Sequence, residues 1–446
     1  MRFTQLTDHD VATMLKRIGA ASVEDLFAPI APAHRLSGPL NLPPALSELE
    51  LLAELDRLAG RNRSCDEMVC FLGGGAYDHF IPTVVDHLAN QSEFVTAYTP
   101  YQAEVSQGAL QAFYEFQTLI CQLTGMDVSN ASLYELASAT AEAVLMARSI
   151  TGRRRVLVAD TVHPDVRVVL RTYTRELPID LVEIPSAQGC INLAVLDERC
   201  DAQTSAVVVQ TPNVFGCVER IDVVASAVHR AGGLAIVLVD PIACGLLKPP
   251  GQLGADIVVG EGQPLGIPLS LGGPYLGIMA CRQEFVRKMP GRLIGATHDA
   301  AGRRAYCLTL QTREQHIRRE RATSNVCTNQ GLLALRAAIY LSVVGRQGIR
   351  RIAALCLDKA HYAARQIAAI DGFQLAYPES PFFKEFVVRT RKDVSDVLAA
   401  CRRQGLLGGV PMGRWFPDMG ECFSVAVTEK RTRAQIDALV AALAEA

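Results

Sequence analysis

The stretch SAVVVQTPNVFGCVERIDVVASAVHRAGGLAIVLVD, residues 205–240, decides the fold class. Two short apolar runs, at 205–210 and 234–240, flank a segment at 222–233 that has helical spacing and ends at two glycines. Continuous runs rich in valine and isoleucine are typical of strands that are buried on both faces of a parallel sheet. The stretch therefore predicts a strand–helix–strand unit in which the helix crosses between two parallel strands.

Further apolar runs extend this pattern in both directions along the chain. Runs at 155–160, 181–185 and 255–260 predict three more buried strands, so we expect a doubly wound α/β domain with a mainly parallel sheet. In such sheets ligands bind beyond the carboxyl ends of the strands. The residues of interest are therefore those that follow the strands, namely Asp160 to His163, Gln210 to Asn213, Asp240 with Pro241, and Glu261 to Gln263.

The flanking sequence predicts three regions: an N-terminal helical segment at 1–62, a large α/β domain at 63–335 and a smaller α+β domain at 336–446. In the first region, Ser47 and Glu50 form a capping-box pattern before a leucine-rich helix. The leucine stripe of that helix has to pack on the main domain or on a partner chain. In the last region, two long helical patterns at 326–368 precede alternating short strands and helices.

Composition excludes several classes of protein. The chain has 446 residues, 49% of them hydrophobic, and a net charge of −2, which does not favour binding to nucleic acid or to an anionic membrane. No run approaches the roughly 20 apolar residues that a membrane span needs, and the N-terminus lacks a signal peptide's apolar core. We therefore expect a cytoplasmic protein. The 13 cysteines include no CxxC pair, so we predict core cysteines and no metal site.

Two polar motifs precede the large domain's first strand. FLGGGAYDHFIP (71–82) contains Asp78 and His79, which could form an acid/base or orienting pair or could instead hold a tight turn. TAYTPYQAEVSQG (96–108) gathers polar and aromatic residues around a proline. Its density of such groups is unlike a core strand and indicates either ligand contact or subunit contact, through Tyr98, Thr99, Tyr101, Gln102, Glu104 and Gln107.

Three other features together are typical of a pyridoxal-phosphate site. Ser138 and Thr140 open a helical run and could cradle a phosphate, although an ordinary helix cap would look the same. His163, at one strand end, could stack on the cofactor ring. Asp240, at another, could pair with the ring nitrogen. Neither residue is specific alone.

Such a site also needs a lysine for the covalent link to the cofactor, and none is present where it is expected. The loop after the strand at 255–260 contains Gln263 and no lysine. Lys248 precedes that strand and Lys288 follows the next one. We therefore expect no catalytic residue and no bound cofactor within this chain alone. An independent pyridoxal-phosphate enzyme that uses Lys248 or Lys288 is the least favoured alternative.

Long contiguous motifs resemble a known family across essentially the whole chain. FLGGGAYDHFIP, EFVTAYTPYQAEVSQGALQAFYEFQTLICQLTGMD, DIVVGEGQPLGIPLSLGGPYLG and LTLQTREQHIRRERATSNVCTNQ look like the α subunit of two-subunit glycine decarboxylase, the P-protein of the glycine cleavage system. The resemblance implies an aminotransferase-like fold, fold type I, and an α₂β₂ assembly.

The resemblance further implies an oxidoreductase reaction shared between two chains. The β subunit would hold pyridoxal phosphate on its lysine. Glycine would be decarboxylated and its aminomethyl group passed to the lipoyl arm of the H-protein. The T-protein and L-protein of the same system would be functional partners.

The family motifs also mark residues of this chain. Tyr98 to Gln107 match the family pattern apart from Ala103, where proline is usual, and are the best candidates for contact with the partner's site. Thr323, Ser324 and Asn325 match a polar loop motif. Glu135 and Leu136 stand where the family has aspartate and glycine, and the leucine could strain the turn or block the vestigial cofactor pocket. A diverged, non-catalytic paralogue that serves another pyridoxal-phosphate enzyme is the alternative function.

Overall fold

The computed structural model describes residues 6–96, 98–322 and 324–446. Its contacts divide the chain into two compact units, Met1–Arg63 and Ser64–Ala446. Thr323, one of the predicted loop residues, lies outside the described residues.

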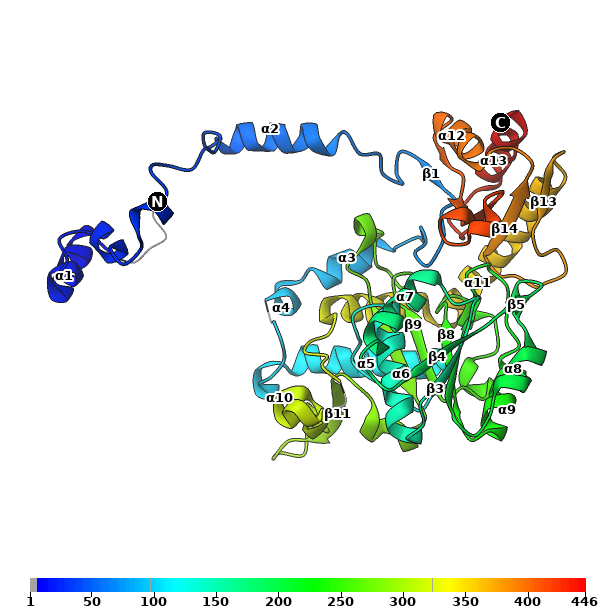
Figure 1. Ribbon diagram of the computed structural model, residues 1–446, viewed down its shortest axis with the longest axis horizontal. Helices are drawn as coiled ribbons and strands as arrows, with labels where there is room; N and C mark the ends of the chain where they lie inside the picture. Colours follow the sequence, from blue (N-terminus) through cyan, green and yellow to red (C-terminus); the bar gives the residue numbers. More distant parts are fainter. Residues whose placement is uncertain (1–5, 97, 323) are drawn as a thin grey trace. The chain divides into compact units, whose positions relative to one another are not determined.

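The first unit contains the helices α1 (Asp8–Ile18) and α2 (Glu48–Ala59) and two short 3₁₀ turns (Figure 1). The predicted capping box before α2 is confirmed: the Ser47 hydroxyl accepts from the Glu50 N–H, and the Glu50 carboxylate accepts from the Ser47 N–H. Neither helix buries a side chain within this unit. The leucine stripe of α2 is therefore not covered by its own unit.

A seven-stranded sheet forms the centre of the second unit, in the order β2-β10-β9-β8-β7-β3-β4. The five central and edge strands β9, β8, β7, β3 and β4 run parallel, and β10 is antiparallel to β9 and to β2. This confirms all five predicted strands. The bounds are β2 (Val128–Ser129), β3 (Arg155–Ala159), β4 (Asp180–Ile184), β7 (Thr204–Thr211), β8 (Leu234–Val239), β9 (Ile257–Glu261) and β10 (Gly277–Cys281).

Helices cover both faces of this sheet (Figure 1). In that view α8 and α9 lie on one side of the strands and α5, α6 and α7 on the other. Strands β7 and β8 have apolar side chains on both faces. The apolar side chains of both helix layers therefore pack against these strands, and together they form one continuous core. The helices are α5 (Gln107–Thr124), α6 (Leu136–Thr151), α7 (Pro164–Thr174), α8 (Leu193–Arg199) and α9 (Ile221–Arg230).

Smaller elements surround this core. The antiparallel hairpin of β11 (Leu293–His298) and β12 (Arg304–Thr309) leads into a chain segment that contains α10 (Gln315–Arg318). Before α5 lie α3 (Thr83–Ala89) and α4 (Ser92–Val95), and β5 (Ser186–Ala187) and β6 (Cys190–Ile191) form a short hairpin.

The C-terminal part forms its own sheet, in the order β13-β14-β17-β16, and a second hydrophobic cluster. Two-residue strands β1 and β15 pair parallel, which ties the start of the second unit to this part. The bounds are β1 (Val69–Cys70), β13 (Phe373–Leu375), β14 (Glu385–Thr390), α12 (Val394–Arg403), β15 (Leu406–Leu407), β16 (Val410–Pro411), β17 (Cys422–Ala426) and α13 (Arg433–Glu445).

One long helical element, α11 (Gly331–Ala368), connects the two hydrophobic clusters. Its backbone leaves the helical conformation at Gly345, where φ is +58°, so the two predicted helices meet end to end. Among the described residues it is the helix that is long and apolar enough to cross a bilayer. Its apolar side chains pack into both clusters, as those of a core helix do.

Candidate functional site

The carboxyl ends of β7, β8 and β9 meet as the sequence predicts, and the space between them is almost filled. Gln210, Asp240 and Glu261 border a cavity of about 30 Å³. A cavity of that size holds roughly one water molecule. The chain's own Tyr77 and Lys384 occupy the adjoining space.

Lys384 is a buried cation at the centre of this region. Its side chain is 2% exposed, and its Nζ lies 2.6 Å from Oδ2 of Asp240. The same Nζ lies 2.9 Å from Nε2 of His79 and 3.7 Å from the centre of the Tyr77 ring. The Asp240 carboxylate is therefore paired with an ammonium group of this chain, at the place where a cofactor ring nitrogen would have to bind.

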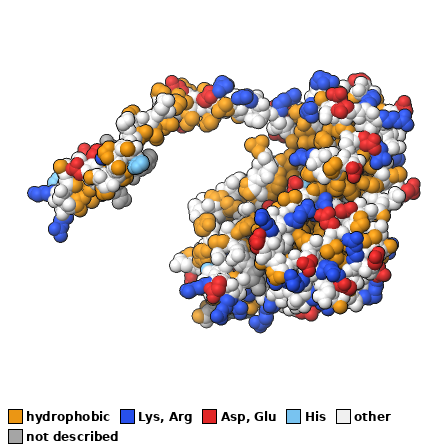
Figure 2. All heavy atoms as spheres, in the orientation of Figure 1, with side chains coloured by type: hydrophobic (Ala, Val, Ile, Leu, Met, Phe, Trp, Pro, Cys, Tyr) orange, Lys and Arg blue, Asp and Glu red, His pale blue; other side chains and the backbone are white. Residues whose placement is uncertain are grey.

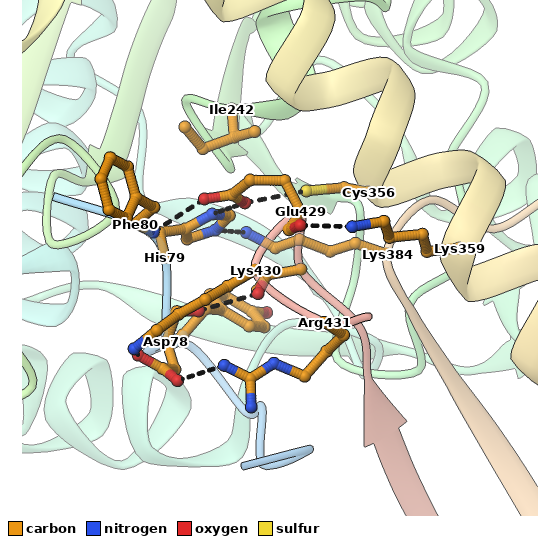
Figure 3. Close-up of polar contacts among 12 residues, drawn as sticks. Asp78, His79, Phe80, Ile242, Cys356, Lys359, Lys384, Glu429, Lys430 and Arg431 are labelled. Carbon is orange, nitrogen blue, oxygen red and sulfur yellow. Dashed lines mark hydrogen bonds and ion pairs between the residues drawn. The ribbon is translucent and has the colours of Figure 1, made fainter. Parts of the chain in front are cut away.

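His79 links Lys384 to a second acid, Glu429 (Figure 3). Nδ1 of His79 lies 2.6 Å from Oε2 of Glu429, whose Oε1 accepts from the Phe80 N–H at 2.7 Å. Burial and the neighbouring Lys384 lower the pKa of His79, so the imidazole is neutral. Since Lys384 can only donate, its contact places the imidazole proton on Nδ1, which donates to Glu429.

The hydrogen bonds of this group also bear on metal binding. His79, Cys356 and Glu429 offer ligand atoms that lie within 4.8 Å of one another. However, Lys384 occupies the lone pair of Nε2, and Nδ1 carries the proton that Glu429 accepts. The imidazole has no lone pair left for a metal ion in this arrangement.

Asp78 forms a second link between the same two chain segments. Its carboxylate accepts from Nζ of Lys430 at 2.8 Å and from a guanidinium N–H of Arg431 at 2.7 Å, and the Asp78 and Arg431 side chains are buried (Figure 3). The prediction left open an acid/base pair or a structural turn. The structure places both Asp78 and His79 in buried contacts that join residues 78–80 to residues 428–431.

Two carboxylates take up the N–H groups at the start of α6, where the sequence predicts a phosphate cradle. Glu135 is the N-cap and accepts from the N–H groups of Ala137 and Ser138 at 2.7 and 3.0 Å. Oε2 of Glu261 accepts from the Leu136 N–H at 3.2 Å. An incoming phosphate would meet two acidic side chains and no free N–H group in this turn.

The predicted cradle hydroxyls therefore have another role. The Ser138 hydroxyl donates to the Glu135 carbonyl and the Thr140 hydroxyl to the Leu136 carbonyl, each within the helix itself. Sequence reasoning placed the helix start near Ser138, but α6 begins two residues earlier because Glu135 caps it. Leu136 has ordinary helical geometry and borders the remaining cavity, so it narrows the pocket without backbone strain.

Gln263, at the position where a lysine would be expected, holds the glycine-rich segment in place. Its side-chain oxygen accepts from the Tyr77 N–H at 2.9 Å, and its amide donates to the carbonyls of Tyr77 and Ile267. The Tyr77 hydroxyl in turn donates to the buried Glu385 at 2.8 Å. Residues 73–77 are thereby fixed across the mouth of the pocket.

His163 packs against an aromatic side chain of the C-terminal part. Its ring meets that of Trp415 edge-on, with the ring centres 4.8 Å apart. Nδ1 accepts from the Asp165 N–H, and Nε2 is buried without a partner among the described residues. The described residues do not fit pyridoxal phosphate as predicted, because the predicted ring-nitrogen partner Asp240 is paired with Lys384 and the N–H groups of the predicted phosphate cradle are taken up by Glu135 and Glu261.

The Tyr98–Gln107 segment lies outside this pocket and is largely exposed. Tyr98 is 88% exposed, and Gln102 and Glu104 are also exposed. Gln107 differs, because its amide exchanges two hydrogen bonds of 2.9 Å with the backbone of Tyr306 in β12. The segment is thus anchored on the β11–β12 hairpin and presents its tyrosines outward.

Arg292 joins this segment to the second polar motif. The buried guanidinium donates to the Asn329 side chain at 3.0 Å and to the Cys327 carbonyl at 3.1 Å, and its carbon lies 5.4 Å from the centre of the Tyr101 ring. Ser324 and Asn325 lie in the same loop, beside a cavity of about 340 Å³. The two motifs that are far apart in the sequence therefore form one surface.

Comparisons with known proteins place the chain in a family. The family model described as the glycine cleavage system P-protein matches residues 1–443. The chain belongs to the glycine cleavage system P-protein family. A relative from Desulforamulus reducens, named "Probable glycine dehydrogenase (decarboxylating) subunit 1", is 51% identical over 443 residues and spans 99% of both chains. A relative from Thermomicrobium roseum with the same name is 50% identical and spans 100% of both.

Solved structures agree with this P-protein assignment. A crystal structure of glycine decarboxylase (P-protein) of the glycine cleavage system, in inhibitor-bound form, superposes with a TM-score of 0.90 at 43% identity, over 100% of both chains. A sphingosine-1-phosphate lyase from Burkholderia pseudomallei matches with a TM-score of 0.67 at 15% identity, over 93% and 94% of the two chains, and shares the fold. The predicted aminotransferase-like fold is confirmed.

Sequence reasoning missed the lysine that reaches the P-protein pocket. Lys248 is exposed, and Lys288 is exposed with its Nζ 3.2 Å from the Ser149 hydroxyl, so neither borders the cavity. Lys384 enters from the C-terminal part, just before β14. The signal was a Lys-Glu pair within PFFKEFVV, where two adjacent charges interrupt an apolar run and need buried partners.

A buried acid outside the pocket gives a pH-dependent prediction. Burial raises the pKa of Glu142 from 4.5 to about 7, although a hydrogen bond with Ser324 opposes the shift. Between about pH 4.5 and pH 7 the folded chain still holds the Glu142 proton, whereas the unfolded chain has lost it. The free energy of unfolding therefore falls as the pH rises from about 4.5 to 7. Glu142→Gln should raise the free energy of unfolding by roughly 3 kcal/mol at about pH 8, and by less than roughly 1 kcal/mol at about pH 5.

Urea denaturation at the two pH values checks this prediction, with Glu176→Gln as the control. Glu176 borders the same cavity, but its side chain is 86% exposed. An equal gain for Glu142→Gln at both pH values would contradict it, because the effect would then not come from ionisation.

Proposed function

We propose that this chain is the α subunit of a two-subunit glycine decarboxylase and acts only together with a β subunit. The observation that carries the proposal is the filled pocket of a P-protein family member, in which Lys384 pairs with Asp240 and Gln263 replaces the expected lysine. Pyridoxal phosphate is then held by the partner subunit, and this chain completes the assembly. The naming of the relatives as subunit 1 supports a second subunit.

The reaction follows from that division of roles. The β subunit with its cofactor decarboxylates glycine and passes the aminomethyl group to the lipoyl arm of the H-protein, in the cytoplasm and within an α₂β₂ complex. When bound, the cofactor supplies the electron sink for the carbanion that remains when CO₂ departs. The residues of this chain contribute by shaping and closing the site at the subunit contact, for which Tyr98, Thr99, Tyr101, Gln102 and Glu104 are the candidates.

Reconstitution tests the proposal directly. The chain is mixed with the cognate β subunit, lipoylated H-protein and pyridoxal phosphate, and exchange of labelled bicarbonate into glycine is followed. We expect exchange in the mixture and none with either subunit alone. A folded complex without exchange would contradict the proposal and favour the diverged paralogue.

The exposed Tyr98 gives a prediction for the subunit contact. Tyr98→Ala removes an aromatic side chain that is 88% exposed in the isolated chain, and buried aromatic anchors contribute strongly to interfaces. We expect the dissociation constant of the α–β complex to rise by about tenfold or more, with the α chain still folded. Analytical ultracentrifugation measures this. Val168→Ala, which truncates a 54% exposed apolar side chain of α7 away from that surface, is the control, and equal effects of both changes would refute the assignment.

A further inference from the structure

A group of basic side chains lies between the Tyr98–Gln107 segment and the loop at 324–329 in the chain, at residues 298–321. It borders the surface that this segment and this loop form. Between His298 and Arg321 the sequence has six arginines and three acidic residues, although the whole chain has a net charge of −2. Figure 2 shows blue side chains gathered at the lower left of the main unit, where Figure 1 places α10 and β11. The arginines are Arg303, Arg304, Arg313, Arg318, Arg319 and Arg321.

Three of these arginines have partners within the chain. Arg313 donates to the carbonyls of Met289 and Gly291 and so fixes the start of the segment, whereas Arg303 and Arg321 pair with Asp299 and Glu320 at the surface. Arg304, Arg318 and Arg319 are exposed and have no acidic partner within 4.0 Å among the described residues. These three exposed side chains carry positive charge that is not neutralised by an ion pair within the described residues, so they can attract an acidic surface.

The segment is held at both ends, and its residues 316–321 are exposed. Arg313 anchors its start, and beyond Thr323 the Asn329 side chain donates to the Ala131 carbonyl at 2.6 Å. Between these anchors Ile317 is 48% exposed beside Arg318. Arginine mixed with a few apolar side chains is the composition of a protein interface, whereas nucleic-acid surfaces need a longer run of cations than this short segment offers.

We propose that Arg318, Arg319 and their basic neighbours form the docking surface for an acidic carrier protein that presents the lipoyl arm. This inference rests on the proposed function. A carrier that exchanges in every turnover gains from electrostatic steering, which raises the association rate without requiring a large apolar contact. The exposed Tyr98 and Val105, in contrast, have the apolar character of a lasting subunit contact.

The test uses the reconstituted complex with lipoylated H-protein as the probe. Arg318→Glu combined with Arg319→Glu should raise the KM for the H-protein by about tenfold or more, leave kcat within about twofold and weaken the salt dependence of kcat/KM. The matched control is Arg402→Glu with Arg403→Glu, a neighbouring pair of exposed arginines at the end of α12. Surface plasmon resonance of H-protein on the complex gives a second readout that does not depend on turnover.

The outcomes separate this inference from the proposed function. An unchanged KM and unchanged H-protein binding would overturn it. Loss of the α–β complex on size-exclusion chromatography would also overturn it, because the arginines would then belong to the subunit contact. Absence of bicarbonate exchange in the wild-type mixture would refute the proposed function. The docking surface would then still be tested by comparing H-protein binding to the wild-type complex and to the arginine variant.

Discussion

Replacing Lys384 by alanine is expected to lower the free energy of unfolding by about 3–5 kcal/mol. The change leaves the Asp240 carboxylate buried without its cation, which now lies 2.6 Å away, and removes the donor to Nε2 of His79. A buried charge without a partner is much more costly than a buried ion pair or a pair of apolar residues. Urea denaturation of the isolated chain measures the effect.

The double variant Lys384→Met with Asp240→Asn is the control for this prediction. It removes both charges and keeps the side chains close to their original volumes, so the loss should be clearly smaller than that of Lys384→Ala. A loss below about 1 kcal/mol for Lys384→Ala would show that the pair is not important for the folded state. The pair joins the end of β8 to the start of β14, so the test also reports on how firmly the C-terminal part is held.

The sheet could be predicted from the sequence because its signals are local. Runs such as 234–240 are apolar on every residue, and the two glycines after α9 mark where the crossover helix ends. The capping box of Ser47 lies within four residues of chain and is confirmed. Such features need no knowledge of distant contacts.

The site could be predicted only in part, because its partners are far apart in the sequence. Asp240 and Gln263 follow predicted strands, so their position at the carboxyl end of the sheet could be predicted. Lys384 and Glu429 come from the C-terminal part of the chain, and no local pattern indicates that they contact the same region. Ser138 was assigned to a phosphate cradle because small hydroxyl residues commonly open helices. Glu135 is a less common cap, and only the structure shows that its carboxylate already occupies the N–H groups.

Restoring the missing lysine should not restore a cofactor site. Gln263→Lys is expected to give no borohydride-trapped pyridoxal phosphate adduct in the isolated chain, since the cavity has only about 30 Å³ and the α6 N–H groups are occupied by Glu135 and Glu261. It should also lower the free energy of unfolding by about 3 kcal/mol or more. The reason is that Gln263 is 2% exposed and makes three hydrogen bonds, which an added ammonium group cannot reproduce.

Gln263→Leu separates the two causes of this loss. It removes the same hydrogen bonds without adding a charge, so it should be less destabilising than Gln263→Lys and equally free of adduct. Absorbance spectra after borohydride reduction, and urea denaturation, are measured for both variants. A trapped adduct in Gln263→Lys with unchanged stability would contradict the filled-pocket description. The pocket would then need only its lysine to bind the cofactor, and the dependence on a partner subunit would lose its structural basis.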